Sequence, residues 1–162
     1  MVLKGMAVIS LLVFLSACAV IDVNMAPYYT APRPDCPVEV ADQRADPGLI
    51  QGNATSYLIT PSLRDLLQSK LCQSAIVLSS ASADNRLAVT ITGLSISSFG
   101  FAGSDQMLTM VGTVRIGGSN RNVRSYGTVE SGVLPSTRWP IILNSAMDNF
   151  VMQVEEGLPG QK

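Results

Sequence analysis

The sequence contains no histidine and few charged residues, and these shortages exclude several kinds of protein. Histidine is the commonest general base and a frequent zinc ligand, so its absence excludes His-based triads and most zinc sites. The 11 basic residues are balanced by 12 acidic ones, which leaves no basic field to attract nucleic acid. No P-loop, dinucleotide fingerprint or Gly-x-Ser-x-Gly elbow occurs. We therefore expect no enzymatic activity, no cofactor, no metal and no nucleic-acid partner.

Long apolar runs are also scarce, with one exception near the N-terminus. Residues 6–15 are apolar apart from Ser10, follow the positive charge of Lys4, and lead into small residues and Cys18. A permanent membrane helix needs about 20 apolar residues, whereas a secretory signal peptide has a shorter apolar region. No later run reaches this length. Residues 1–17 are therefore expected to direct export.

The tetrad Leu15-Ser16-Ala17-Cys18 resembles the lipobox of bacterial lipoproteins. The resemblance implies cleavage just before Cys18, and acyl chains such as palmitate on Cys18 that anchor the mature chain in the lipid bilayer. In Gram-negative lipoproteins an Asp directly after the cysteine favours retention in the inner membrane. Ala19 at that position implies the periplasmic face of the outer membrane. The alternatives are an ordinary signal peptide with a chance cysteine, or a buried N-terminal helix.

The remaining chain divides into a short leader region and one domain. Removing residues 1–17 from 162 leaves 145, enough for a single domain with a core. Residues 18–35 contain three prolines and no helical or alternating pattern, so we expect the lipidated N-terminus and an extended tether there. Residues 36–157 are expected to form one α+β domain, and residues 158–162 a tail.

Alternating apolar residues predict a three-strand antiparallel meander. Its first strand begins at Leu87, and a change of phase at Gly93 indicates a β-bulge. The second strand follows a turn at 100–104, and Gly117-Gly118-Ser119-Asn120 closes a hairpin with the third, 121–133. Shorter strands are predicted at Val38–Ala41, Tyr57–Ile59 and Ala75–Leu78.

Two amphipathic helices are predicted on one face of this mostly antiparallel sheet. The first begins with Thr60 as cap and Pro61 as first residue, and ends near Leu71. The second begins at 135–137 and ends at Gly157. Trp139 is expected to cover one end of the core. The sheet face without helices is expected to meet solvent or a partner.

Two cysteines remain after Cys18, and both lie near predicted element ends. Cys36 opens the first strand, and Cys72 closes the helix that runs back from it. An even number of cysteines in an exported chain favours a disulfide. The alternative is two small buried thiols.

Candidate contact residues for a protein partner are aromatic. Phe99 and Phe101 flank Gly100 at a hairpin end, and Tyr126 faces outward on the meander. The alternative for the two phenylalanines is that they fold back over the core. The cluster Asp42, Arg44 and Asp46 is expected to be solvated or paired rather than a metal site.

Several stretches together resemble the YajG-type outer-membrane lipoproteins. They are the lipobox, residues 40–46 (Val-Ala-Asp-Gln-Arg-Ala-Asp), the helix 60–71, residues 83–87 and the terminal helix. Auxiliary lipoproteins of ABC-type lipid transporters have a comparable layout of helices on a sheet. The first resemblance implies an accessory or scaffold component of a cell-envelope assembly, with an envelope protein as partner. The second implies an auxiliary lipoprotein that binds a lipid or small ligand.

Overall fold

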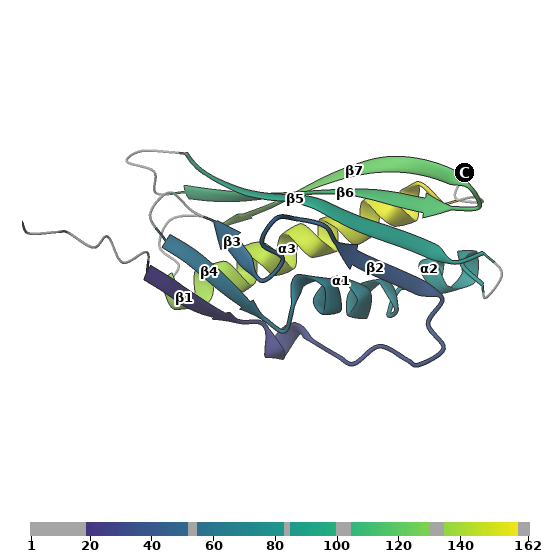
Figure 1. Ribbon diagram of the computed structural model, residues 1–162, viewed down its shortest axis with the longest axis horizontal. Helices are drawn as coiled ribbons and strands as arrows, with labels where there is room; N and C mark the ends of the chain where they lie inside the picture. Colours follow the sequence, from purple (N-terminus) through teal and green to yellow (C-terminus); the bar gives the residue numbers. More distant parts are fainter. Residues whose placement is uncertain (1–18, 52–54, 83–84, 100–104, 130–134, 159–162) are drawn as a thin grey trace, which may run out of the picture.

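The computed structural model describes residues 19–51, 55–82, 85–99, 105–129 and 135–158 (Figure 1). These residues form an α+β fold with a four-stranded sheet, β2-β5-β6-β7, and a three-stranded sheet, β1-β4-β3. The elements are β1 (Ala19–Asn24), η1 (Ala26–Tyr28), β2 (Val38–Asp42), β3 (Leu49–Gln51), β4 (Thr55–Thr60), α1 (Leu63–Leu71), α2 (Ala75–Ser80), β5 (Leu87–Phe99), β6 (Asp105–Ile116), β7 (Ser119–Val129) and α3 (Pro135–Glu156).

The predicted meander is confirmed in β5, β6 and β7, which pair antiparallel in chain order. The β5–β6 register shifts between Ile91 and Gly93, so the predicted bulge is present. Gly117 and Gly118 have φ angles of 55° and 82°, the left-handed conformation that the β6–β7 turn requires. β2 pairs parallel with β5 along the other side of that strand. This sheet is therefore mostly antiparallel with one parallel edge.

The long helix α3 lies under the meander and contributes much of the core (Figure 1). The apolar face expected of this amphipathic helix is confirmed: Leu143, Ala146, Met147, Phe150 and Val154 are buried, and Val151 is partly buried. The helix approaches β7 closely where the strand presents small residues. Ser125 Oγ donates to the Ala146 carbonyl at 2.8 Å, and a Cβ on Gly127 would lie only 2.8 Å from the Ala146 amide nitrogen.

Helix α1 buries its predicted leucine stripe but begins later than predicted. The N-cap is Ser62, not Thr60; its hydroxyl accepts from the Asp65 amide at 3.2 Å and donates to the Asp65 carboxylate at 2.7 Å. Ser62 offers the same capping chemistry two residues on, whereas Thr60 is the last residue of β4 and its carbonyl accepts from the Met25 amide. Burial acts to raise the pKa of Asp65, but hydrogen bonds from Ser62 and Arg64 and the Arg64 charge outweigh it and lower that pKa.

The strand predicted at Ala75–Leu78 is wrong, because Ala75–Ser80 forms helix α2. Ser74 caps this helix, and its hydroxyl accepts from the Val77 amide at 3.1 Å. The same hydroxyl donates to Glu155 of α3 at 2.5 Å. Periodicity cannot separate a buried strand from a short helix in a run of four apolar residues, and here the cap and the contact with α3 favour the helix.

The tether predicted at residues 18–35 is wrong at Ala19–Asn24, where the structure has a strand. Ala19–Asn24 forms β1, which pairs parallel with β4 from Ala19 opposite Thr55 to Asn24 opposite Thr60. Val23 and Met25 are buried in the core. A parallel partner 36 residues away leaves no local pattern in the sequence, and the prolines that suggested a tether lie after this strand.

The three-stranded sheet covers the end of α3 that carries Trp139. The Trp139 and Tyr57 rings lie 4.3 Å apart between their centroids, at an angle of 45°. Trp139 is buried, and Ile50 and Ile59 complete this end of the core. The position expected for the single tryptophan is thus confirmed.

Candidate functional site

The proposed anchor, Cys18, lies outside the described residues, but the element that follows it is described. Ala19 is the first residue of β1, which is an edge strand of the three-stranded sheet. Val20 is 58% exposed and Ile21 is 47% exposed. The chain therefore has ordered structure from the residue directly after Cys18. Within the described parts, no helix is both long and apolar enough to cross a membrane.

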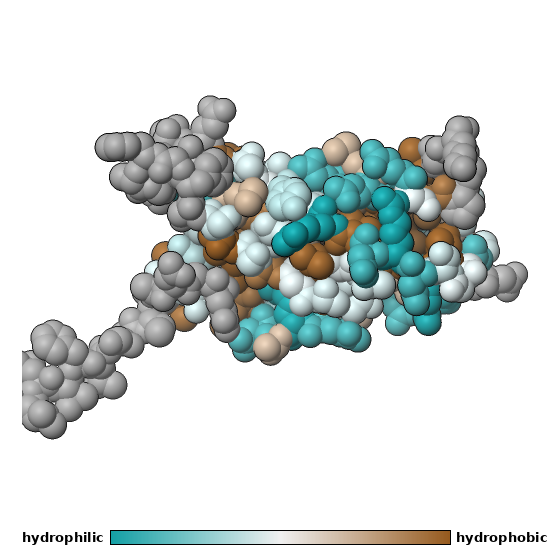
Figure 2. All heavy atoms as spheres, turned by 90° about the horizontal axis from the view of Figure 1, so that it is seen from above, coloured by the Kyte–Doolittle hydropathy of each residue, from teal (hydrophilic) through white to brown (hydrophobic). Residues whose placement is uncertain are grey.

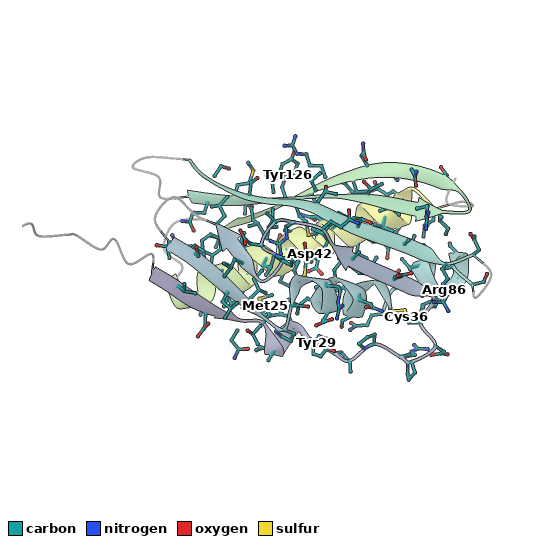
Figure 3. The ribbon with its side chains drawn as sticks, viewed as in Figure 1. Met25, Tyr29, Cys36, Asp42, Arg86 and Tyr126 are labelled. Atoms are coloured by element: carbon teal, nitrogen blue, oxygen red, sulfur yellow. A yellow bond between two sulfur atoms is a disulfide. The ribbon has the colours of Figure 1, made fainter. Side chains whose placement is uncertain are left out.

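Cys36 and Cys72 lie at disulfide distance, with their Cα atoms 5.8 Å apart (Figure 3). Cys72 is the C-cap of α1, and Cys36 lies just before β2, as the sequence suggested. The pair holds the N-terminal segment against α1. Nothing else in the described residues marks these cysteines as a reactive site, and we assign them a structural role.

The uncovered face of the four-stranded sheet carries Tyr126. Its side chain projects on the side away from α1 and α3 and is 41% exposed (Figure 3). The Arg124 guanidinium lies 5.9 Å from the centre of its ring. Across the strands, Tyr126 is in register with Thr109, which in turn is in register with Ser95. Figure 2 shows that hydrophilic and apolar residues are mixed on this face.

The structure does not gather the predicted aromatic contacts into one patch. Ser95 is the residue of β5 that aligns with Tyr126 across the sheet. Phe99, the last residue of β5, lies four positions beyond Ser95. At roughly 3.3 Å per residue this is a backbone separation of about 13 Å along the sheet. Phe101 lies outside the described residues. Of the three, Tyr126 alone has a described side chain on the uncovered face.

The acidic and basic residues at the end of β2 form a buried ion pair. Arg44 donates from Nε to Asp42 Oδ1 at 2.8 Å and from Nη2 to Asp42 Oδ2 at 2.6 Å. Its Nη1 also donates to the Leu49 carbonyl at 2.8 Å. The expectation that these charges are paired is confirmed for Asp42 and Arg44. The pair fixes the loop between β2 and β3, and Asp42 lines a cleft of about 680 Å³ beside the start of α1.

A second cavity lies between the β6–β7 hairpin and the C-terminal end of α3, with a volume of about 260 Å³. Its apolar lining comes from three strand residues and two residues at the end of the chain. Arg121, Asn85 and Ser119 are the polar side chains that line it. The full lining is Asn85, Val114, Ile116, Gly117, Ser119, Arg121, Val123, Val154, Gly157 and Leu158. No local sequence pattern marks this site, because it forms only where segments far apart in the chain meet.

Comparisons with known proteins give no named relative. No family model matches the chain, and no curated protein matches it. One similar solved structure is described only as an uncharacterized protein: it has a TM-score of 0.43 and 13% identity, and the match covers 86% of this chain and 88% of the other. Another is a Xanthomonas campestris protein described by the family model DUF330, with a TM-score of 0.42, 10% identity and coverage of 85% and 92%. At these values the likenesses carry no argument about function.

Proposed function

We propose that this chain is a lipoprotein anchored in the outer membrane through Cys18, on the periplasmic face. It acts as a non-enzymatic accessory or scaffold component of a cell-envelope assembly. The observation that carries the proposal is the sheet face opposite α1 and α3, where Tyr126 and Arg124 stand exposed. A large aromatic ring beside an arginine is the composition typical of protein contact sites.

The position of β1 supports a role at the membrane surface. Because β1 starts directly after Cys18 and pairs with β4, a lipid on Cys18 holds the domain close to the bilayer. Exposed Val20 and Ile21 lie in the same short strand. The domain would therefore bind its partner at the membrane surface, within the same envelope assembly.

The anchor is tested by mass spectrometry of the mature N-terminal peptide from the protein's own host. The expected peptide begins at Cys18 and carries a diacylglyceryl group and an acylated amine. The Cys18→Ser variant should lose the modification and leave the membrane fraction. A mature chain that begins elsewhere, or an unmodified Cys18, would refute the anchor.

The partner is tested by site-specific photo-crosslinking in intact cells. A photoreactive phenylalanine analogue replaces Tyr126 on the uncovered sheet face. The matched control replaces Met152, which is 52% exposed on α3. We expect a reproducible envelope protein adduct from position 126 and none from position 152. Identical adduct patterns, or none from position 126, would count against the sheet face as the contact.

A second candidate function is carriage of a small apolar ligand for an envelope transport system. The cavity at the C-terminal end of α3 favours it, because apolar cavities between helices and sheets are common ligand sites. Native mass spectrometry of protein purified from its host would detect a co-purified lipid. Ligand-free protein under conditions that preserve lipid binding would exclude this function.

A further inference from the structure

The interior of the cavity between the β6–β7 hairpin and α3 suits a hydrocarbon chain. Its five aliphatic side chains, which are all buried, are Val114, Ile116, Val123, Val154 and Leu158. The volume of about 260 Å³ is just below the usual range for small-molecule sites, about 300–1,000 Å³. Such a lining offers little to water and gains from burying apolar surface. The expected occupant of the interior is therefore a single aliphatic chain.

The polar side of the cavity carries a positive charge with hydrogen-bonding capacity to spare. Arg121 Nη1 donates to the Gln153 carbonyl at 3.1 Å. Among the described residues the ion pairs of 4.0 Å or less join other side chains, and none includes Arg121. A guanidinium has five N–H donors, and two of them in parallel match a carboxylate or phosphate. The Asn85 amide, which lies near Gly117 at the same cavity, adds a neutral donor.

Gly157 sets the position of this guanidinium. A Cβ on Gly157 would lie 2.8 Å from Arg121 Cζ and closer still to Nη1. The absence of a side chain therefore lets the arginine lie against the end of α3, where it borders the apolar lining. The glycine at the end of α3 thus leaves room for the arginine beside the apolar cavity.

We propose that this cavity binds an amphiphile with one aliphatic chain, and that its anionic head group pairs with Arg121. The inference rests on the second candidate function above and gives it a site and a ligand class. The same chemistry is shared by a free fatty acid and by a lysophospholipid. Charge complementarity with Arg121 selects an anionic head over a neutral or cationic one.

The test is a calorimetric titration of a chain that begins at Ala19, which retains every described element. The ligands are decanoate and decylammonium, each below its micelle concentration, and decanol within its aqueous solubility. We expect saturable binding of decanoate, weaker binding of decanol, and the weakest binding of decylammonium. Arg121→Gln should weaken decanoate binding by about tenfold or more, as for the loss of a charged hydrogen-bond partner, and leave decanol unchanged.

Two further variants separate a binding role from a folding role. Arg124→Gln removes the same charge from the same strand on the opposite face and should bind decanoate like the unchanged protein. Gly157→Ala keeps Arg121 but displaces its guanidinium, and should lower decanoate affinity with little loss of thermal stability. Native mass spectrometry of protein from its host then distinguishes a fatty acid from a lysophospholipid by mass.

The titration results separate the head-group inference from the proposed carriage of an apolar ligand. Equal decanoate affinity in the unchanged protein and Arg121→Gln, with decanol also bound, would overturn the head-group inference and leave carriage of an apolar ligand standing. Saturable binding of none of the three ligands would overturn both. Neither result bears on the accessory role, which is tested by crosslinking at Tyr126.

Discussion

The Ser69 hydroxyl exchanges two hydrogen bonds with the backbone of Thr30. It donates to the Thr30 carbonyl at 2.5 Å and accepts from the Thr30 amide at 3.2 Å. Ser69 lies on α1 and is fully buried, and Gln73 also donates to its hydroxyl at 3.0 Å. A segment that looks like a free linker in the sequence is therefore attached to the first helix by the Ser69 side chain as well as by the Cys36–Cys72 pair.

Replacing this hydroxyl should destabilise the domain. Ser69→Ala leaves the Thr30 amide and carbonyl without their partner, and we expect the free energy of unfolding to fall by about 1–3 kcal/mol. Urea denaturation followed by circular dichroism measures the change. Ser79→Ala, at an exposed position on α2, is the matched control and should change stability by less than about 0.5 kcal/mol. Equal effects at the two positions would show that the Thr30 contact contributes nothing.

The close approach of α3 to β7 makes Gly127 intolerant of any side chain. A Cβ there would overlap the Ile142 carbonyl and lie 3.0 Å from its carbon, and backbone atoms cannot move aside cheaply. We expect Gly127→Ala to destabilise by about 3 kcal/mol or more, beyond usual overpacking. Gly93→Ala is the control, since its Cβ would meet only Val111 Cβ at 3.6 Å. Thermal unfolding compares the two, and a stable Gly127→Ala variant would contradict this packing.

The two ion pairs in β2 and α1 should differ sharply in their effect on stability. Asp42→Asn leaves the buried Arg44 guanidinium without its counter-charge, so we expect a loss of about 3–5 kcal/mol. Asp148→Asn breaks the exposed pair with Lys70 and should cost less than about 1 kcal/mol. Chemical denaturation of both variants at the same pH tests this. Similar losses would mean that Arg44 is not held as the structure shows.

The disulfide should stabilise the domain through the loop that it closes. The two cysteines are 36 residues apart, and the chain-entropy model assigns such a loop about 3–4 kcal/mol. The Cys36→Ser, Cys72→Ser double variant should lose about this amount of unfolding free energy. The unchanged protein in dithiothreitol serves as a second measurement, and the two should agree. A double variant with the same free energy of unfolding as the native protein would show that the pair is not bonded there.

Local patterns predicted most of the four-stranded sheet and both long helices. Alternation identified the inward side chains of β6, and the glycine at 93 located the bulge, because each depends only on neighbours in the chain. β1 and α2 were mispredicted for the opposite reason. Pairing of β1 with β4 and the contact of Ser74 with Glu155 both join distant segments, and no local pattern records them.

The residues of the candidate sites were likewise predicted only where a local pattern marks them. Tyr126 was predicted outward from the alternation of β7, and the structure places it there. Arg121 gave no signal of a binding site and Gly157 was predicted only as the end of the second helix, because the two residues are 36 positions apart and meet only after α3 has packed on the sheet. Motif analysis does not detect a binding site whose residues are distant in the sequence and are of common types.

The pairing of β1 determines how close the start of this strand lies to the folded body. β1 is an edge strand with one partner, β4, but the buried side chain of Val23 also joins it to the core. Release of its six residues would lengthen the distance from residue 18 to the folded body by about 20 Å, at roughly 3.3 Å per residue. Pairing of β1 with β4 therefore keeps the start of the described chain against the folded body.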